Sequence, residues 1–546
     1  MAVMAWMLTA PPLYRPELSG LRHETAMELR GLLASSMHAD LRWPEFSAYR
    51  TQVTTFYSSL GYAFAWTEGG LPTAVSRGVI EALIASASKG LDPEDYDGPR
   101  WSSRLLELQK QGTSPSDLAR FDLSLTISTM RYVSDLCAGK VNPKLLHPGF
   151  RFTHDSPDPA IFLRERLLPA DNPRLVLESL EPQFDGYRRT KEVLHLYREL
   201  EGRDTNQPLP RLPKPLEPGD SYSGIKRLTE LLHLMGDLPG DAVVPAQLDV
   251  YQSSLVEAVK KFQIRHGLSP DGRVDAGTLR ELNTPLRRRV RQLQLTLERW
   301  RWVPQKFPRP PIMVNIPEFR LRALSDAYLT ELDMKVVVGK AYRHRTPVFA
   351  AELTHVIFRP YWNVPLSIVR GEVLPVLERT GLTEAYRDFQ IVTLDGTVVA
   401  NPGVGDRTLP LLRSGKLLIR QLPGPKNALG LVKFIFPNDN NVYLHDTPTQ
   451  HLFSKARRDF SHGCIRVEKP EALAEWVLRN NSEWSPQRIA AAMNGTGTVQ
   501  ANANPAIPVL IVYATAVALK GGEVRFFPDI YGHDASLEVQ LAQPHP

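Results

Sequence analysis

The chain contains 546 residues, 42% hydrophobic and 23% charged, with a formal net charge of +6 at pH 7, as expected for a soluble globular protein of roughly three or four domains. A charge this small for the length, with no block of basic residues interleaved with aromatic ones, gives no indication of a nucleic-acid partner. The two cysteines, Cys137 and Cys464, exclude a disulfide framework and a multi-cysteine metal site, although a single disulfide between them stays open.

The start of the chain carries no clear targeting signal. Residues 1–10 are apolar, but the first basic residue is Arg15. The apolar run is too short to span a bilayer and lacks the basic region of a signal peptide. We see no other long apolar stretch and expect no transmembrane segment. Either the start shown is trimmed or the protein stays inside the cell.

Residues 1–205 are predicted to form a helical scaffold domain. Apolar residues recur at helical spacing over 79–84 and 123–133. The acidic segment 92–96 follows Gly90 and is typical of a turn that opens a helix. We recognise no catalytic group of residues in this part of the chain.

A linker over 206–220 is predicted next, because it contains prolines at positions 208, 210, 213, 215 and 218. Prolines at this spacing resist helix and sheet and make a semi-rigid connector. A compact helical segment is predicted after it, over 221–290. There Val256, Val259 and Phe262 share one helical face, and Gly267 suits a helix C-cap.

The end of this segment resembles a known module. Phe262-Gln263, Gly267-Leu268 and Asp271-Gly272 follow one another in the order found in the type 1 peptidoglycan-binding domain, a small three-helix module. The resemblance implies that residues 221–290 contact the cell wall. The alternative is a generic helical hairpin, and even a true member can have lost sugar binding and serve only as a spacer.

From residue 297 to 535 the sequence predicts a β-rich domain. Short runs of alternating or β-branched residues occur at 312–316, 320–324, 335–338, 355–358, 442–444 and 509–513. Residues 373–422 interrupt this pattern with a helical stretch over 373–380 and a loop over 398–408, which indicates an inserted subdomain. The predicted fold class is therefore multi-domain α+β.

One short string in this domain carries the chemistry. Ser461-His462-Gly463-Cys464 follows a second histidine, His445, by fewer than twenty positions. A thiol attacks carbonyls as thiolate, and a neighbouring imidazole can accept its proton. His462 could flank Cys464 in an extended segment, and His445 could face it from an adjacent strand. Spacing alone does not choose between the two histidines.

The residues on either side of the thiol fit an acyl-transfer site. Gly463 has no Cβ, so the backbone can approach a substrate closely. Backbone N–H groups near Gly463 and Cys464 could then stabilise an oxyanion, each contributing about 3–4 kcal/mol. Arg466 adds a permanent charge that could favour the thiolate or hold a carboxylate. A buried structural cysteine is the alternative, and the intact string speaks against it.

Ser461-His462-Gly463-Cys464-Ile465-Arg466, with His445 upstream, resembles the signature of the L,D-transpeptidase catalytic domain. The resemblance implies that Cys464 is the nucleophile and His445 the base, with the main-chain carbonyl of Asp446 orienting the ring. The remaining residues that it assigns to the pocket and oxyanion hole are Ser461, His462, Gly463, Tyr443 and Arg466.

Features outside the signature agree with one subgroup of this family. Many members have Asn in place of Arg466, and Arg is the variant of the large, multi-domain Gram-negative enzymes. Trp300-Arg301-Trp302 resembles the entry segment of these enzymes, and Tyr361-Trp362-Asn363 resembles the aromatic stretch beside their cleft. Residues 373–422 correspond to their capping subdomain.

The resemblance implies a two-step acyl transfer between peptidoglycan tetrapeptide stems that gives 3→3 cross-links. It implies a periplasmic protein, acylation of the cysteine by carbapenems, and other wall synthases as candidate partners. Neither metal nor cofactor is expected. Two alternatives stay open. Water or a lipoprotein lysine could replace the stem amine as acceptor, or the protein could be a non-catalytic wall-binding scaffold.

Overall fold

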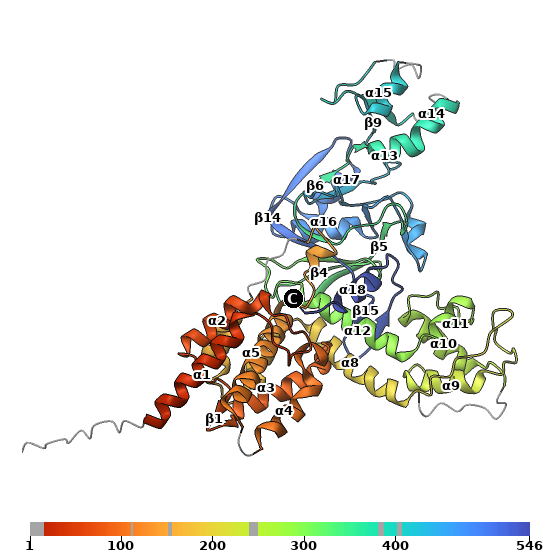
Figure 1. The fold of residues 1–546 in the computed structure, drawn as a ribbon. Helices are drawn as coiled ribbons and strands as arrows, with labels where there is room; N and C mark the ends of the chain where they lie inside the picture. Colours follow the sequence, from red (N-terminus) through yellow and green to blue (C-terminus); the bar gives the residue numbers. More distant parts are fainter. Residues whose placement is uncertain are drawn as a thin grey trace, which may run out of the picture.

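The computed structural model describes residues 16–110, 113–150, 156–239, 249–380, 387–400 and 407–545. It contains a helical region from the N-terminal half, a β-rich body, a small helical module at one side of it and a separate subdomain beyond its far end (Figure 1). The α+β fold class is confirmed. The apolar start at 1–10 lies outside the described residues.

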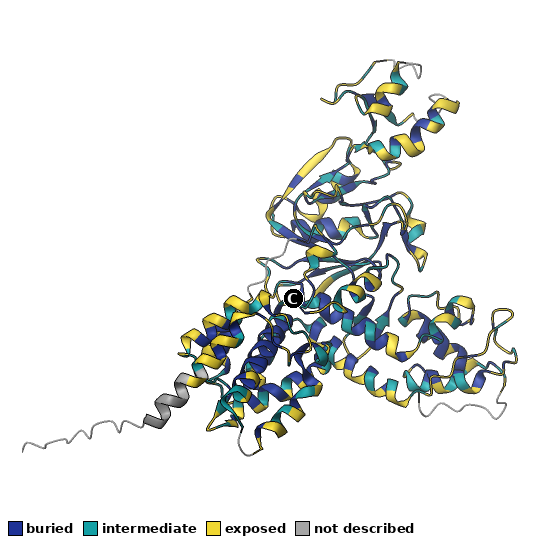
Figure 2. Ribbon diagram, viewed as in Figure 1, coloured by how far each residue is buried: buried dark blue, intermediate teal, exposed yellow. Residues whose placement is uncertain are grey.

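The helical region is built around one long buried helix. This helix, α5 (Pro115–Ala138), is dark blue along its length in Figure 2. It begins with a capping box between Ser114 and Asp117 and with Pro115 at its first position, both of which favour a helix start. The helices packed around it are α1 (Pro16–Ala34), α2 (Arg50–Ser59), α3 (Ala74–Ile84), α4 (Trp101–Leu108), α6 (Pro159–Phe162) and α7 (Pro173–Glu178).

The module after the linker has its own apolar core. Its described helices are α9 (Ile225–Leu234), α10 (Ser253–Arg265) and α11 (Ala276–Leu282). Leu209 and Leu216, both in the predicted linker, are buried in this core, so part of the linker belongs to the module. Gln263 joins the α10 end to the following turn, because its amide oxygen accepts from the Gly272 N–H at 2.9 Å.

Helix α12 (Leu286–Arg301) connects the parts of the molecule. It packs along α8 (Asp185–Arg203) and against the hairpin β15 (Ala516–Ala518) and β16 (Val524–Phe526). The module contacts the same hairpin, since the His266 ring stacks on Phe526 with centroids 5.8 Å apart. Helix α18 spans His533–Leu541 and so crosses residue 535, where the sequence placed the end of the last domain.

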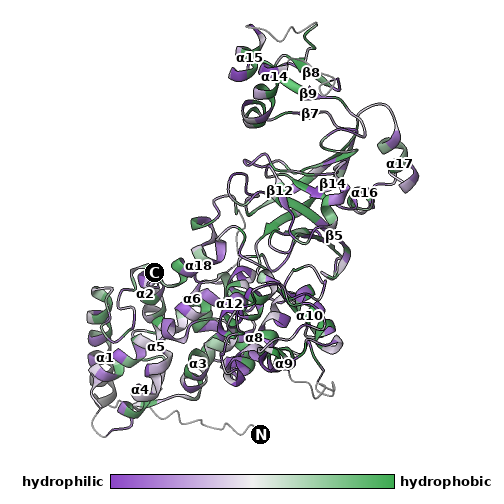
Figure 3. Cartoon of the chain, turned by 90° about the vertical axis from the view of Figure 1, so that its right-hand side faces the viewer, coloured by the Kyte–Doolittle hydropathy of each residue, from purple (hydrophilic) through white to green (hydrophobic). Residues whose placement is uncertain are grey.

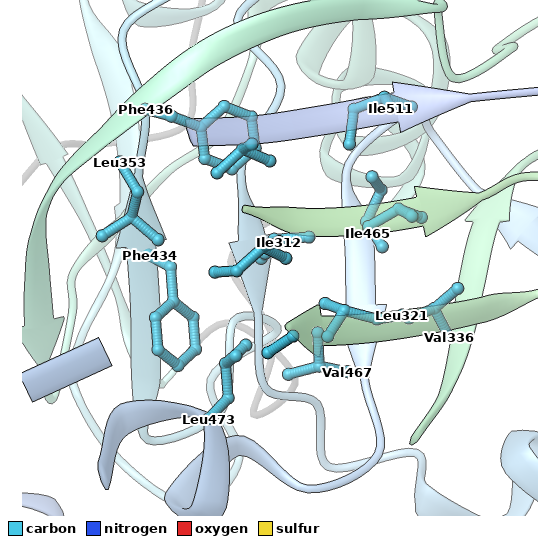
Figure 4. Close-up of a cluster of buried hydrophobic side chains, with 14 of the residues drawn as sticks. Ile312, Leu321, Val336, Leu353, Phe434, Phe436, Ile465, Val467, Leu473 and Ile511 are labelled. Carbon is cyan, nitrogen blue, oxygen red and sulfur yellow. The ribbon is translucent and has the colours of Figure 1, made fainter. Parts of the chain in front are cut away.

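The β-rich body is one sheet in the strand order β12-β5-β13-β11-β10-β6-β14-β3-β4, and β4 also pairs with β5, which closes the sheet on itself. Its apolar interior is the cluster in Figure 4. Helices α16 (Pro470–Leu478) and α17 (Pro486–Asn494) follow β13 along the chain. The strands are β3 (Ile312–Asn315), β4 (Arg320–Leu324), β5 (Thr330–Gly339), β6 (Phe349–Phe358), β10 (Val432–Ile435), β11 (Leu444–His445), β12 (Asp459–Ser461), β13 (Ile465–Val467) and β14 (Val499–Val512).

A small subdomain stands apart from this body in both views (Figures 1 and 3). Its sheet has the order β7-β9-β8, formed by β7 (Trp362–Asn363), β9 (Leu418–Gln421) and β8 (Phe389–Val392). Its helical segments are α13 (Leu366–Ile368), a π-helical turn (Val369–Val373), α14 (Leu374–Thr380) and α15 (Thr408–Ser414).

The subdomain begins earlier than residue 373, where the sequence placed its start. Strand β7 pairs with β9, and Val364 is buried in the subdomain's own core. A two-residue strand that pairs across more than fifty positions leaves no local signal in the sequence, which explains the difference. The loop predicted over 398–408 lies partly outside the described residues.

Among the described residues, no helix combines the length and apolar character needed to cross a bilayer.

Candidate active site

Three neighbouring strands bring the predicted site residues onto one face of the sheet. Strand β11 lies between β10 and β13, with His445 opposite Lys433 on one side and Arg466 on the other. The register of the parallel β11–β13 pair places Tyr443 beside Cys464 one step earlier. Because side chains alternate along a strand, these five residues share the outer face.

The residues between them point to the opposite face. Phe434, Leu444 and Ile465 alternate with the site residues and are buried in the interior of the sheet, where Phe434 and Ile465 are drawn in Figure 4. A slip of one residue in any of these strands would move apolar side chains into the site and charged ones into the core. The interior packing therefore holds the site residues in register.

Hydrogen bonds fix the turn that carries Cys464. The Ser461 hydroxyl donates to the Cys464 carbonyl oxygen at 2.6 Å and accepts from the Gly463 N–H at 3.1 Å. Thr346 donates to the Gly463 carbonyl oxygen at 2.7 Å. Gly463 has φ of 114°, a conformation that side chains with a Cβ rarely adopt, so this position requires glycine.

This turn changes the expectation for the oxyanion hole. The sequence offered the N–H groups of both Gly463 and Cys464 as donors, but the Gly463 N–H already donates to Ser461. The hydrogen bonds of the described residues include none from the Cys464 N–H. Of these two N–H groups, the one of Cys464 is thus without an acceptor among the described residues.

Cys464 is half-buried, and Asn441 and Tyr443 lie around its sulfur. Its thiol lies 3.7 Å from the Asn441 carbonyl oxygen, and both the hydroxyl and the backbone N–H of Tyr443 are hydrogen-bond donors toward the sulfur. Burial raises the pKa of Cys464, while Tyr443, Lys433 and Arg466 act in the opposite direction. The resting side chain is therefore the thiol rather than the thiolate at neutral pH.

Cys137 lies in a different setting. It is buried in α5, and burial raises its pKa to about 12. Both cysteines are free, so the single disulfide that the sequence left open is absent from the described residues.

His445 is held in one orientation by the main chain. It is buried, and its Nδ1–H donates to the carbonyl oxygen of Asp446 at 2.5 Å. Nε2 is therefore the ring nitrogen with a free lone pair. Burial, together with the charges of Arg466 and Lys433, lowers the pKa of His445 to about 3, so the imidazole is uncharged at neutral pH.

The Asp446 side chain does not contact the imidazole. Its carboxylate accepts hydrogen bonds from the N–H groups of Leu431 at 2.8 Å and Thr447 at 2.7 Å. A Cβ on Gly430, which has φ of 62°, would overlap this carboxylate. The contact of His445 with Asp446 thus runs through the backbone, at the carbonyl named from the sequence.

The His462 side chain points toward the subdomain and not toward His445. Its Nε2 lies 2.6 Å from Glu372 Oε1, and its ring lies 4.6 Å from that of His344, centroid to centroid. Glu372 belongs to the π-helical turn of the subdomain. A second contact from the subdomain is a hydrogen bond between Trp362 and Tyr443. The subdomain thus contacts His462, in the loop before Cys464, and Tyr443, in the neighbouring segment before β11.

Sequence reasoning missed Lys433, Asn441 and Glu372. Lys433 sits in the strand Val432–Ile435, where alternation is visible but the partner strand is not. Asn441 has φ of 52°, which asparagine tolerates better than most residues. Glu372 lies far from the signature in sequence, and no local pattern connects the two.

Comparisons with known proteins agree with this geometry. Residues 51–194 match the family model of a scaffold domain, and residues 221–282 match that of a "putative peptidoglycan binding domain". Residues 309–509 match the L,D-transpeptidase catalytic domain. A Haemophilus influenzae protein named "Putative L,D-transpeptidase" is 32% identical over 228 residues, which are 42% of this chain and 45% of that protein.

Residues 309–509 of the chain belong to the L,D-transpeptidase catalytic-domain family. All the site residues described above, and the subdomain, lie within the range matched by the L,D-transpeptidase catalytic domain. The aligned relative is covered over less than half of its length. Among the described residues, no group of three or more His, Cys, Asp or Glu side chains could hold a metal ion. The expectation that the reaction needs no metal or cofactor stays a prediction.

Proposed function

We propose that this protein forms 3→3 cross-links between peptidoglycan stems by acyl transfer through Cys464. The observation that carries the proposal is the pairing of β11 with β13, which sets a buried, uncharged His445 and the Cys464 thiol on one sheet face. A scaffold domain and a peptidoglycan-binding domain on the same chain support a wall substrate. A wall substrate in turn supports a periplasmic location.

In the first half-reaction, His445 Nε2 takes the proton of the Cys464 thiol. The sulfur attacks the carbonyl carbon of the third residue of a tetrapeptide stem. The oxyanion that forms accepts a hydrogen bond from the Cys464 N–H. The carbon–nitrogen bond then breaks, and the terminal D-Ala leaves as an amine with the proton returned by His445. A thioester remains on Cys464.

In the second half-reaction, the side-chain amine of diaminopimelate on another stem attacks this thioester. His445 accepts a proton from the amine, and the new amide bond replaces the carbon–sulfur bond. The Cys464 sulfur leaves and recovers its proton from His445. The cross-link joins the third residues of the two stems, and the enzyme returns to its starting state.

The acceptor decides between this function and its alternatives. A positioned group can reach an effective concentration of about 10⁵ M or more, which exceeds that of water, about 55 M. A subdomain that contacts His462 through Glu372 and Tyr443 through Trp362 would exclude water, and the peptidoglycan-binding domain would hold the second strand near. We therefore favour a stem amine over water or a lipoprotein lysine.

The test is an analysis of muropeptides after incubation with purified tetrapeptide-containing material. We expect 3→3 cross-linked dimers, with tripeptides as a minor hydrolytic product. Tripeptides without dimers at any acceptor concentration would replace the proposal with a carboxypeptidase. Unchanged material, with no carbapenem adduct on Cys464, would replace it with a non-catalytic scaffold.

The pH dependence of acylation follows from the buried imidazole. Because the pKa of His445 is lowered to about 3, falling pH does not protonate this base until far below the usual histidine range. We expect the rate constant for acylation by a carbapenem to show no loss from His445 protonation between pH 8 and pH 5. Stopped-flow measurements across this range check it, and a half-loss between pH 6 and pH 7 would contradict it.

Removal of the subdomain should leave the central sheet folded but reduce activity on large substrates. Its core and sheet are its own, so replacing residues 362–421 with a short glycine-serine linker is expected to leave the central sheet folded. Cross-linking of intact sacculi should fall strongly, because the subdomain would no longer keep water away from Cys464. Circular dichroism and muropeptide analysis measure the two effects. Unchanged cross-linking would contradict the capping role.

A further inference from the structure

Lys433 occupies the position on the outer face opposite His445, next to the nucleophile. Its ammonium nitrogen lies 3.7 Å from the centroid of the Tyr443 ring, and the Tyr443 hydroxyl is hydrogen-bonded to Cys464. A cation over an aromatic face is attracted by the ring, which fixes the otherwise flexible lysine. The lysine, the tyrosine and the thiol thus form a contiguous row across β10, β11 and the start of β13.

Among the described residues, the charge of Lys433 has no carboxylate partner within ion-pair distance, although the side chain is half-buried. Arg466, on the other side of His445, likewise pairs with no carboxylate in the described part of the chain and donates to the Thr449 hydroxyl at 3.0 Å. Withdrawing a charge from water without a counter-charge is costly, so two such cations beside one thiol point to an anion that forms there.

We propose that Lys433 is a positioning residue for the acyl-transfer reaction: its ammonium group, held against the Tyr443 ring, stabilises the negative charge that develops on the Cys464 sulfur. The inference rests on the proposed role of Cys464 as nucleophile. It assigns to Lys433 a function in the site that neither the signature nor the family match contains.

Few charged or titratable residues lie close enough to the Cys464 sulfur to stabilise a negative charge on it. Tyr443 directly precedes β11, which provides His445, while β13 provides Arg466 and β10 provides Lys433. The two histidines of the adjoining loops, His344 and His462, lie against each other, and His462 contacts Glu372. His355, on β6, shares the face of Lys433, and strands β10 and β11 separate β6 from the strand that follows Cys464. Its ring Nδ1 lies 2.9 Å from the Thr354 hydroxyl oxygen.

Burial and charge act on the thiol in opposite directions. Burial raises the pKa of Cys464, and the positive charges of Lys433 and Arg466 lower it. The thiol in turn raises the pKa of Lys433, which burial lowers. Removing the lysine charge would therefore remove one of the groups that oppose the effect of burial on the pKa of Cys464, while Arg466 and the Tyr443 hydrogen bonds would remain.

The experiment measures the pH midpoint of Cys464 alkylation by iodoacetamide, a neutral reagent, in the full chain carrying Cys137→Ala. Peptide mass spectrometry quantifies the modified cysteine. In Lys433→Met we expect the midpoint to rise by about one pH unit. Below the midpoint the rate should fall only about three- to fourfold, because a thiolate of higher pKa is the better nucleophile. Lys433→Arg keeps the charge and should restore the original midpoint.

A matched control is Lys335→Met. Lys335 is a half-buried lysine on the same sheet face, and it donates to the Phe453 carbonyl oxygen at 3.0 Å. Its removal should leave the alkylation midpoint unchanged. If Lys433→Met fails to fold by circular dichroism, Lys433→Gln supplies a second neutral side chain with a polar end.

The outcomes separate this proposal from its alternatives. An unchanged midpoint in a folded, neutral Lys433 variant overturns it, and an accompanying rise in KM for the donor stem would make Lys433 a substrate-binding residue instead. A midpoint that Lys433→Arg fails to restore also overturns it. Alkylation requires no turnover, so these results are independent of whether the cross-linking function is correct, which Cys464→Ala and the muropeptide products test.

Discussion

Replacing Cys464 with alanine is expected to abolish both turnover and carbapenem adduct formation while the protein stays folded. The proposed chemistry forms a covalent bond to this sulfur, and no other side chain on the face is a thiol. The thiol is half-buried, so the substitution leaves little empty space in the core. Intact-protein mass spectrometry after incubation with a carbapenem measures the adduct, and thermal unfolding monitors the fold.

Cys137→Ala is the matched control, because it removes the other free cysteine of the chain. That thiol is buried in α5 and has a raised pKa, so it should neither react nor take part in turnover. The Cys137→Ala variant should still form the carbapenem adduct and retain activity. It should lose some stability, because Cys137 is buried. An adduct that persists in the Cys464 variant would refute the assignment of the nucleophile.

Replacing His445 with alanine is expected to slow acylation by about 10²–10⁴-fold, the usual contribution of a general base. Its Nδ1–H donates to the Asp446 carbonyl oxygen, so Nε2 is the nitrogen with a lone pair for the thiol proton. Stopped-flow acylation with a carbapenem gives the rate constant. Thermal unfolding gives the accompanying loss of stability, which should be modest by comparison.

Two other histidines serve as references for this substitution. His355→Ala removes an imidazole from the same sheet face on β6 and should leave acylation nearly unchanged. His462→Ala breaks the contact with Glu372 and should impair acylation less than His445→Ala does. A protein in which His462 alone is sensitive would assign the base to His462.

The proposed nucleophile and the two candidate bases could be named from the sequence because they lie close together in it. Residues 461–466 form one continuous string, and its resemblance to a family signature depends on local order alone. The choice between His445 and His462 could not come from spacing. It depends on the parallel pairing of β11 with β13 and on where each imidazole finds a hydrogen bond.

Other parts of the site lie beyond local sequence patterns. Lys433 belongs to an ordinary alternating strand, and only its register opposite His445 places it in the site. Glu372 reaches His462 across ninety positions, and β7 joins the subdomain by pairing with β9. The Gly463 N–H was a reasonable oxyanion donor until the structure placed the Ser461 hydroxyl against it. Long-range pairing decides each of these cases.

The fold class was accessible because its signals repeat along the chain. Helical periodicity before residue 205 and alternation after 297 predicted α+β, and strand β4 has the predicted limits, Arg320–Leu324. The prolines of residues 206–220 predicted a linker, but part of this segment packs on the following module. Leu209 and Leu216 are buried in the module, because a leucine in a polar stretch can dock on a core that local sequence does not show.

The most direct test of the account is to trap the acyl-enzyme formed from a tetrapeptide donor and to locate the modified residue by peptide mass spectrometry. Rapid acid quenching without an acceptor stem should capture it. We expect an added mass equal to the donor without its terminal D-Ala, on the peptide that contains Cys464 and on no other. Turnover of the donor with Cys464 unmodified, or with the acyl group on another residue, would contradict the account.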